Sequence, residues 1–368
     1  MKVLINIVRV LVGLLFIFSG LIKANDPLGL SYKMQEFFEL WGMEQFNAHT
    51  LWLSVVMIAF EIIAGIALLL GWRMKLFMWL LLLLIVFFTF LTGYAYLSGK
   101  FKNCGCFGDC IPITPFTSFL KDVILTVLIL FLFRHRDKIR PVFNHKLNVA
   151  LMILGTIFSF GVQWYMLNYL PLFDCLAYKK GNNIQEQMKM PEGAIMDSFA
   201  IRFIYQKDGK DFEFAPENLP ADLGSYTYKS REDKLIRKGN AEPPIKGFTL
   251  SGVTGIDSTD VVLSHPQAIL LFAEDFSTPI SAWKADFEKL YASANAKNIP
   301  VYAITGRSEE AKRQFAGTGF SDVQILTCDN TAIRTASRTN PSVYLLKQGT
   351  IVEKESYKRM DKLTSAIQ

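Results

Sequence analysis

Apolar residues are concentrated in the first 171 positions of this 368-residue chain, where they fall into five runs. Each run reaches or approaches the ~20 residues that an α-helix needs to cross the hydrocarbon of a bilayer. The runs cover residues 3–22, 51–71, 75–97, 117–133 and 148–170. This pattern predicts five transmembrane helices followed by a water-soluble part.

The segment between the first two runs, residues 23–50, is patterned differently. Its aromatic and apolar side chains recur at helical spacing among Glu36, Glu39 and Glu44. Such spacing is typical of a short amphipathic helix that lies on the membrane surface.

The rest of the chain divides into two parts. Residues 172–245 are polar, and strand-like runs at 199–206 and 211–214 flank a turn, which predicts a β-rich extension. From residue 246, strands alternate with helices before a closing hairpin, which is typical of an α/β sheet domain. We therefore expect a mixed fold with domains at 1–171, 172–245 and 246–368. In the last domain we expect strands at 268–273, 301–304, 323–327, 342–347 and 350–353, and helices at 280–296, 308–316 and 330–337.

Basic residues beside the five runs predict the orientation in the membrane. Eight lie on the side of the N-terminus and four on the other side, so the positive-inside rule places the N-terminus in the cytoplasm. An odd number of spans then places everything after residue 171 in the periplasm of a bacterial inner membrane. Polar residues rather than small ones follow the first run, so we expect a retained anchor. Lipid headgroups and topology account for the net charge of +6, and we expect no nucleic-acid partner.

Three of the five cysteines, Cys104, Cys106 and Cys110, fall within seven residues between the third and fourth runs, and Cys175 follows the fifth. All four are expected on the same, oxidising side of the membrane. Three alternatives remain open. One is a structural disulfide between the loop and Cys175, and another is a redox pair of Cys104 and Cys106, with Cys110 and Cys175 as resolving or structural partners. The third is a zinc site of four thiolates, which an oxidising compartment disfavours. Cys328, at a strand end, is typical of a buried structural thiol.

Glu61 lies near the centre of the second run, where a charge costs about 2.5–3.5 kcal/mol. It must therefore be protonated, paired or next to water, and the partners available are Arg9 in the first run and Lys121 with Asp122 in the fourth. One interpretation is a neutral acid hydrogen-bonded to a neighbouring helix. The other is a proton relay or a quinone site, because a quinone could reach the cysteine loop from the bilayer.

The residues from Arg9 to Gly29 (RVLVGLLFIFSGLIKANDPLG) resemble the first helix of the DoxX and MauE-like membrane proteins. The pattern CGCFG at residues 104–108 resembles the MauE branch of that family. The resemblance covers about residues 1–135 and implies a four-helix core, which this chain exceeds by one helix. It also implies a role in thiosulfate:quinone oxidation or, on the MauE side, in the maturation of disulfide-rich enzymes during methylamine utilisation.

The terminal domain is similar to the thioredoxin fold. The similarity rests on the strand at 268–273 and on the residues TNPSVYLLKQG at 339–349, where that fold places a cis-proline before a hairpin, so Pro341 is the candidate. The chain departs from the family at Glu274 to Ser281, which contain no cysteine where thioredoxins carry C-x-x-C. Without that thiolate the domain cannot perform dithiol exchange, and we expect it to dock or position an envelope protein partner.

Two functions are consistent with these features. In the first, Cys104 and Cys106 exchange disulfides with an envelope protein while electrons pass to a quinone near Glu61. In the second, the chain is a non-catalytic scaffold or assembly subunit of an envelope complex, and its cysteines form structural disulfides. A transporter is disfavoured because the five spans show no inverted repeat. The sequence leaves open whether the chain is an enzyme.

Overall fold

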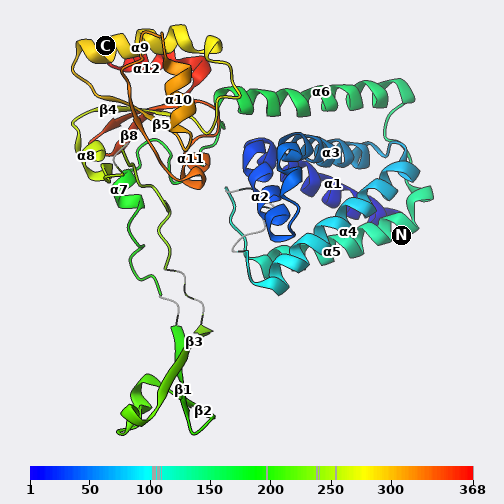
Figure 1. Cartoon of the computed structure of the whole chain (residues 1–368). Helices are drawn as coiled ribbons and strands as arrows, with labels where there is room; N and C mark the ends of the chain where they lie inside the picture. The colour runs from blue at the N-terminus through cyan, green and yellow to red at the C-terminus, as the bar shows by residue number, and fades with distance from the viewer. Residues whose placement is uncertain are drawn as a thin grey trace.

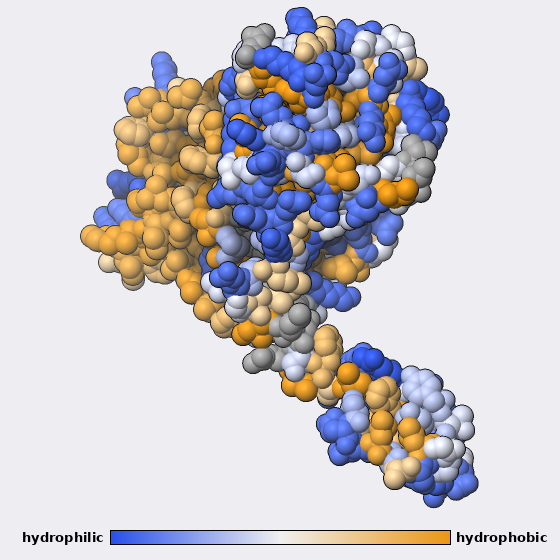
Figure 2. Space-filling view, turned by 90° about the vertical axis from the view of Figure 1, so that its left-hand side faces the viewer, coloured by the Kyte–Doolittle hydropathy of each residue, from blue (hydrophilic) through white to orange (hydrophobic). Residues whose placement is uncertain are grey.

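A computed structural model describes residues 1–101, 105, 108, 110–195, 198–237, 239, 241–252 and 255–367. The chain forms a helical membrane domain, a small three-stranded sheet and an α/β domain (Figure 1). In the space-filling view the membrane domain presents a largely apolar surface and the α/β domain a largely polar one (Figure 2). The predicted mixed fold is confirmed.

Within the described ranges, five helices are long and apolar enough to cross a membrane, which confirms the prediction. Local signals set their ends. Pro115 stands in the first turn of the fourth span, where Thr114 accepts a hydrogen bond from the backbone of Thr117, and Gly71 ends the second span with a left-handed residue. The five helices are α1 (Lys2–Ala24), α3 (Thr50–Leu70), α4 (Met74–Ser98), α5 (Pro115–Arg134) and α6 (His145–Tyr169). The protein is a multi-pass membrane protein.

Helices α1 and α3 cross closely because glycines face each other at the crossing. A Cβ atom built on Gly65 would lie 2.8 Å from the carbonyl oxygen of Gly13, so a side chain at this position would collide with the neighbouring backbone. Val12 and Phe16 of α1 and Ala64 of α3 are buried around the crossing. This close packing places the buried polar residues of α3 against the end of α1.

Helix α2 (Pro27–Leu40) occupies the segment that was predicted to be amphipathic, and the short helix η1 (Glu44–His49) follows it. The side chain of Asp26 caps α2 by accepting a hydrogen bond from the backbone of Gly29 at 2.9 Å. Phe37 is buried against the bundle and stacks on Phe101, with ring centroids 4.2 Å apart. Helix α2 therefore covers the end of the bundle that faces the α/β domain, here called the α2 end (Figure 1).

The three-stranded sheet extends away from the rest of the chain as an arm (Figure 1). Its strands are antiparallel, in the order β2-β1-β3. The first two strands form the predicted hairpin, whereas the third was not expected, because charged residues interrupt its apolar pattern. The described residues of the arm are exposed or half-buried. The strands are β1 (Ser198–Lys207), β2 (Lys210–Phe214) and β3 (Thr227–Arg237).

The α/β domain contains a five-stranded sheet with the order β6-β5-β4-β7-β8. Strands β4, β5 and β6 are parallel, whereas β7 is antiparallel to β4 and β8 is antiparallel to β7. The peptide bond between Asn340 and Pro341, directly before β7, is cis. Every strand predicted for this domain is present: β4 (Ala268–Phe272), β5 (Val301–Ile304), β6 (Gln324–Leu326), β7 (Ser342–Lys347) and β8 (Thr350–Ser356).

Helices cover both faces of this sheet. Successive apolar residues of β4 point alternately to one face and to the other. Ile269 and Leu271 pack with α9 (Lys284–Ala296), α10 (Ser308–Phe315) and α12 (Met360–Ile367). Leu270 and Phe272 pack on the opposite face with α8 (Thr259–Ser264) and α11 (Asn330–Ala336).

Residues 172–245 were predicted to form one extension, but the structure divides them between the α/β domain and the arm. Tyr178 and Ile184, the latter at the start of α7 (Ile184–Gln187), are buried in the hydrophobic core of the α/β domain. Residues 198–237, in contrast, form the arm. The segment after α6 therefore connects the membrane domain directly to the α/β core.

Candidate functional site

The clustered cysteines stand between α4 and α5 in the chain, and the described Gly105 of this interval lies beside Lys33 of α2. Cys104 and Cys106 lie outside the described residues, whereas Gly105 between them is described. Cys110 forms a disulfide with Cys175, and their Cα atoms are 4.9 Å apart. Of the alternatives left open by the sequence, the structure thus contains the disulfide between the loop and Cys175. This bond takes two of the four thiolates that the zinc alternative requires.

Cys328 is buried in the α/β core. Burial raises the pKa of its thiol to about 11. A thiol with so high a pKa is protonated at neutral pH and is a poor nucleophile, which agrees with the predicted structural role.

The Cys110–Cys175 disulfide lies where several parts of the chain meet. Asn25, at the end of α1, donates a hydrogen bond to the carbonyl oxygen of Phe173 at 2.8 Å and accepts one from its N–H at 3.0 Å. The same Asn25 amide nitrogen lies 4.0 Å from the Sγ atom of Cys110. Asp174 forms an ion pair of 2.9 Å with the buried Lys354 of β8, and burial lowers the pKa of that lysine against the opposing effect of Asp174. Both residues directly before Cys175 are therefore held in place.

Cys175 is exposed and lines a polar cleft of about 610 Å³ between α2 and α11. Charges of both signs surround this cleft. Its lining includes Lys33, Glu36 and Glu39 of α2, Pro112 of the loop, Arg334 of α11 and Arg338, which follows that helix.

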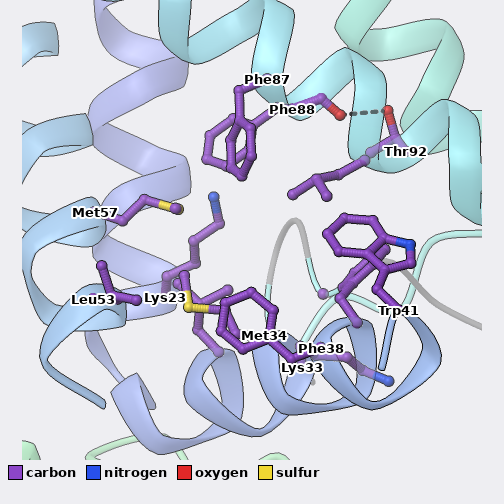
Figure 3. A pocket seen from close by; sticks show the side chains of 14 residues that line it. Lys23, Lys33, Met34, Phe38, Trp41, Leu53, Met57, Phe87, Phe88 and Thr92 are labelled. Carbon is purple, nitrogen blue, oxygen red and sulfur yellow. Dashed lines mark hydrogen bonds between the residues drawn. The ribbon is translucent and has the colours of Figure 1, made fainter. Parts of the chain in front are cut away.

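A second, apolar pocket of about 180 Å³ lies within the bundle between α2, α3 and α4 (Figure 3). Gly105 and Lys33 also line it, and a Cβ atom built on Gly105 would lie 3.0 Å from the Cγ atom of Lys33. Lys33 lines both the polar cleft and the apolar pocket. Gly105, which separates Cys104 from Cys106 in the chain, therefore lies where the cleft and the pocket approach each other. The apolar side chains include Met34, Phe38, Trp41, Leu53, Met57, Phe87, Phe88 and Leu91.

Glu61 is buried and forms an ion pair with Lys23 in the last turn of α1. The Oγ atom of Ser19 donates a hydrogen bond to the other carboxylate oxygen at 3.2 Å. The ammonium group of Lys23 lies 4.7 Å from the centroid of the Phe88 ring and points into the apolar pocket (Figure 3). One end of this pocket therefore carries a charged hydrogen-bond donor.

The sequence did not identify Lys23 as the ion-pair partner of Glu61 and named Arg9, Lys121 and Asp122 as the available partners instead. The guanidinium group of Arg9 lies 3.5 Å from the carbonyl oxygen of Arg140, and Lys121 pairs with its neighbour Asp122 at 2.5 Å. Lys121 and Asp122 line the same small cavity as Glu61. The sequence placed Lys23 beyond the first span, whereas α1 continues to Ala24. The four-residue spacing between Ser19 and Lys23, which puts both on one face of a helix, was the signal that could have identified this partner.

Glu274 follows β4 and begins the stretch from Glu274 to Ser281, which contains no cysteine. Tyr32 of α2 donates a hydrogen bond to Glu274 at 3.0 Å, and Arg334 donates one at 2.7 Å. The guanidinium groups of Arg334 and Arg338 lie 5.4 and 5.5 Å from the centroid of the Tyr32 ring. The buried Arg338 also forms an ion pair of 2.8 Å with the half-buried Asp26. Burial, reinforced by Glu274, raises the pKa of Tyr32. This surface of the α/β domain therefore contacts the chain's own membrane domain.

Comparisons with known proteins agree with the membrane domain described above. Residues 1–134 match the family model described as methylamine utilisation protein MauE, and the match ends where α5 ends. The resemblance to MauE-type membrane proteins is thereby confirmed for this part of the chain. Residues 199–238, which include most of the arm, match a domain of unknown function (DUF8463).

Among curated proteins, the chain is similar to Protein TlpB of Flavobacterium psychrophilum. The two are 32% identical over 158 residues, which is 41% of this chain and 42% of that protein. The similarity thus spans less than half of the relative's length. No solved structure matches the chain.

Proposed function

We propose that the protein is a thiol-disulfide redox component of the bacterial cell envelope, embedded in the inner membrane and linked to a quinone. Cys104 and Cys106 form its redox pair. The match of the membrane domain to a family described by methylamine utilisation supports a role in the maturation of an envelope enzyme. The observation that carries the proposal is the apolar pocket, because Gly105, the residue between Cys104 and Cys106 in the chain, lines it.

The pocket has the chemistry of a quinone site. Aromatic, leucine and methionine side chains supply its apolar lining, and Lys23 supplies a hydrogen-bond donor for a quinone oxygen. The reaction balances as a two-electron exchange. The dithiol of Cys104 and Cys106 loses two electrons and two protons as one S–S bond forms, and the quinone gains both to become a quinol. In this proposal Glu61 takes up or releases the proton through its ion pair with Lys23, which lines the pocket.

The site faces the extracytoplasmic side in this proposal. The excess of basic residues on the side of the N-terminus supports that orientation. The Cys110–Cys175 disulfide supports it as well, because disulfides persist in oxidising compartments.

The α/β domain is thioredoxin-like in this proposal, and its role is to position a partner. Parallel strands β4 and β5, followed by the antiparallel pair β7 and β8, support the assignment. Because residues 274–281 contain no cysteine and Glu274 contacts Tyr32, the domain does not exchange disulfides at this end of β4. It forms one wall of the polar cleft, where an envelope protein docks.

Electron transfer from a dithiol to a quinone tests the proposal. The full-length chain in mild detergent is given dithiothreitol and a soluble naphthoquinone, and the quinol is measured by absorbance. We expect turnover by the wild type and by Cys328→Ser, and its loss in Cys104→Ser and Cys106→Ser. Equal rates in all four proteins would refute the redox pair.

A pocket-filling substitution tests the quinone site separately. Leu91 lines the apolar pocket, whereas Leu97 on the same helix is 83% exposed on the surface. We expect Leu91→Trp to raise the KM for the quinone at least about tenfold, because the larger ring occupies the pocket. Leu97→Trp should leave the KM unchanged. Identical KM values for the two variants would place the quinone elsewhere.

One observation favours the scaffold alternative. Residues 274–281 contain no cysteine, and Glu274 accepts a hydrogen bond from Tyr32 of the membrane domain. In that case the chain holds an envelope partner without oxidising it. Copurification from mild detergent separates the two functions. A partner that is retained and fully oxidised despite Cys104→Ser and Cys106→Ser together supports the scaffold, and a partner that is retained but remains reduced supports the redox function.

A further inference from the structure

Resting on the function proposed above, we propose that the Cys110–Cys175 disulfide is the bond that a partner's thiolate attacks. The polar cleft admits a cysteine-bearing segment of a water-soluble protein, and the electrons then pass to Cys104 and Cys106. The disulfide therefore does more than tie the loop to the segment after α6.

The two sulfur atoms of this disulfide have different surroundings. Cys175 is exposed and lines the polar cleft, whereas Cys110 is half-buried and its Sγ atom lies 4.0 Å from the amide nitrogen of Asn25. Asn25 itself is 6% exposed. An incoming thiolate can thus reach Cys175, and the leaving thiolate of Cys110 receives a hydrogen bond that stabilises its charge.

The backbone around Cys175 is fixed from both domains. Asn25 of the membrane domain binds both backbone groups of Phe173, and Lys354 of the α/β domain binds Asp174. Attack on a disulfide needs the nucleophile in line with the S–S bond. Anchors on the two residues before Cys175 hold that bond in one orientation at the wall of the cleft.

The cleft and the pocket differ in the kind of molecule that they suit. Lys33, Glu36, Glu39 and Arg334 bring both charge signs to the cleft, which suits a hydrated polypeptide. The pocket, by contrast, is lined almost entirely by apolar side chains, which suits a lipid-soluble acceptor. An electron donor from water and an acceptor from the bilayer therefore approach the cysteine loop from separate sides.

The relay balances in three exchanges. The partner's first thiolate bonds to Cys175 and releases the thiolate of Cys110. The partner's second thiolate then attacks the mixed disulfide, which leaves the partner oxidised and Cys175 reduced. Finally the reduced pair of Cys110 and Cys175 transfers two electrons and two protons to the Cys104–Cys106 disulfide by the same chemistry, and the quinone reoxidises that pair.

The test uses the oxidised full-length chain in detergent with the reduced peptide Cys-Gly-Gly-Cys as donor and a soluble naphthoquinone as acceptor. Acid quenching and mass spectrometry identify the cysteine that carries the peptide. We expect the adduct on Cys175 in excess over Cys110. We also expect peptide-dependent turnover to fall at least about tenfold when both cysteines are changed to serine, while the smaller dithiothreitol still reduces Cys104 and Cys106 directly.

Asn25 is a positioning residue for the leaving sulfur, and Asn25→Asp tests this role. The change removes the donor to Cys110 and adds a negative charge, so the rate of peptide attack should fall at least about tenfold. The alkylation profile of Cys110 in the reduced protein should move to higher pH. Asn182→Asp is the matched control, because the Asn182 amide also binds a backbone carbonyl of this segment, that of Ala177 at 2.8 Å. It should leave both readouts unchanged.

The outcomes are distinguishable. Wild-type peptide turnover in the double serine variant, or an adduct that favours Cys110, would overturn the relay and leave the disulfide as a structural tie. An adduct on Cys175 without naphthoquinone reduction from either donor would instead overturn the quinone link of the proposed function, while upholding Cys175 as the atom that is attacked.

Discussion

Ion pairs in the arm and in the membrane bundle join the same kinds of side chain in opposite surroundings. Arg202 and Glu213 of the arm are 2.6 Å apart, and their side chains are 56% and 54% exposed. Lys23 and Glu61 pair inside the bundle, where their side chains are 5% and 1% exposed. Water screens the first pair, so it contributes little to stability. The second pair cannot lose one member without leaving an uncompensated charge in apolar surroundings.

From this difference we infer that burial, more than the number of ion pairs, decides which contacts stabilise the structure. The arm carries several exposed pairs and has no buried residue among those described. The contact between Asp26 and Arg338, with side chains 14% and 5% exposed, joins the two large domains. A substitution should therefore cost more stability the more deeply the affected side chain is buried.

The largest effect is expected from breaking the buried pair of the bundle. Lys23→Met leaves Glu61 without its cation and should destabilise the membrane domain by about 3–5 kcal/mol. Thermal unfolding of the detergent-solubilised chain measures this loss. Lys33→Met is the control, because Lys33 lines the same pocket but pairs with the half-exposed Glu36. Combining Lys23→Met with Glu61→Gln should recover most of the stability, and full stability of the Lys23→Met variant alone would contradict the argument.

Burial of the Cys328 thiol should make the stability of the α/β domain depend on pH. The folded-state pKa of about 11 exceeds the ordinary value of 9.0, so the unfolded chain loses this proton first as the pH rises. The stabilising contribution is complete below about pH 9 and decreases by about 2–3 kcal/mol towards pH 11. Chemical unfolding of the wild type and of Cys328→Ala across this interval measures the difference. If the free energy of unfolding depended on pH in the same way in both proteins, the raised pKa of Cys328 would be contradicted.

The contact between the domains should show an intermediate effect. Arg338→Gln removes the positive charge that pairs with Asp26. We expect the free energy of docking between the α/β domain and the membrane domain to weaken by about 1–3 kcal/mol. Faster proteolysis at residues 171–176 reports that loss. A double-mutant cycle with Asp26→Asn isolates the coupling between the two side chains. A coupling energy indistinguishable from zero would show that other contacts hold the domains together.

The smallest effect is expected in the arm. Arg202→Ala, alone or with Glu213→Ala, should leave the unfolding midpoint unchanged within error, because both side chains are half-exposed. Circular dichroism of the full chain at low and high salt measures this. A loss as large as that of Arg338→Gln would disprove the proposed dependence on burial.

Much of the fold follows from local sequence patterns. The five spans and every predicted strand of the α/β domain are present, because the apolar period of a helix or strand is set by neighbouring residues. Strand β3 was missed, since its register depends on pairing with β1 and its own residues are mostly charged. The candidate site was predictable only in part. Its cysteines were evident from their clustering, but neither the polar cleft nor the apolar pocket exists until α2 packs against the other elements.

The amino-acid sequence alone determined that this is a multi-pass membrane protein with an α/β domain beyond its last span, because length and apolar periodicity are properties of each segment by itself. Only the tertiary structure decided that Cys110 pairs with Cys175, that Lys23 rather than Arg9 binds Glu61, and that Glu274 contacts Tyr32. These pairings join residues far apart in the chain. Their choice depends on how helices cross and domains dock, which no local pattern encodes.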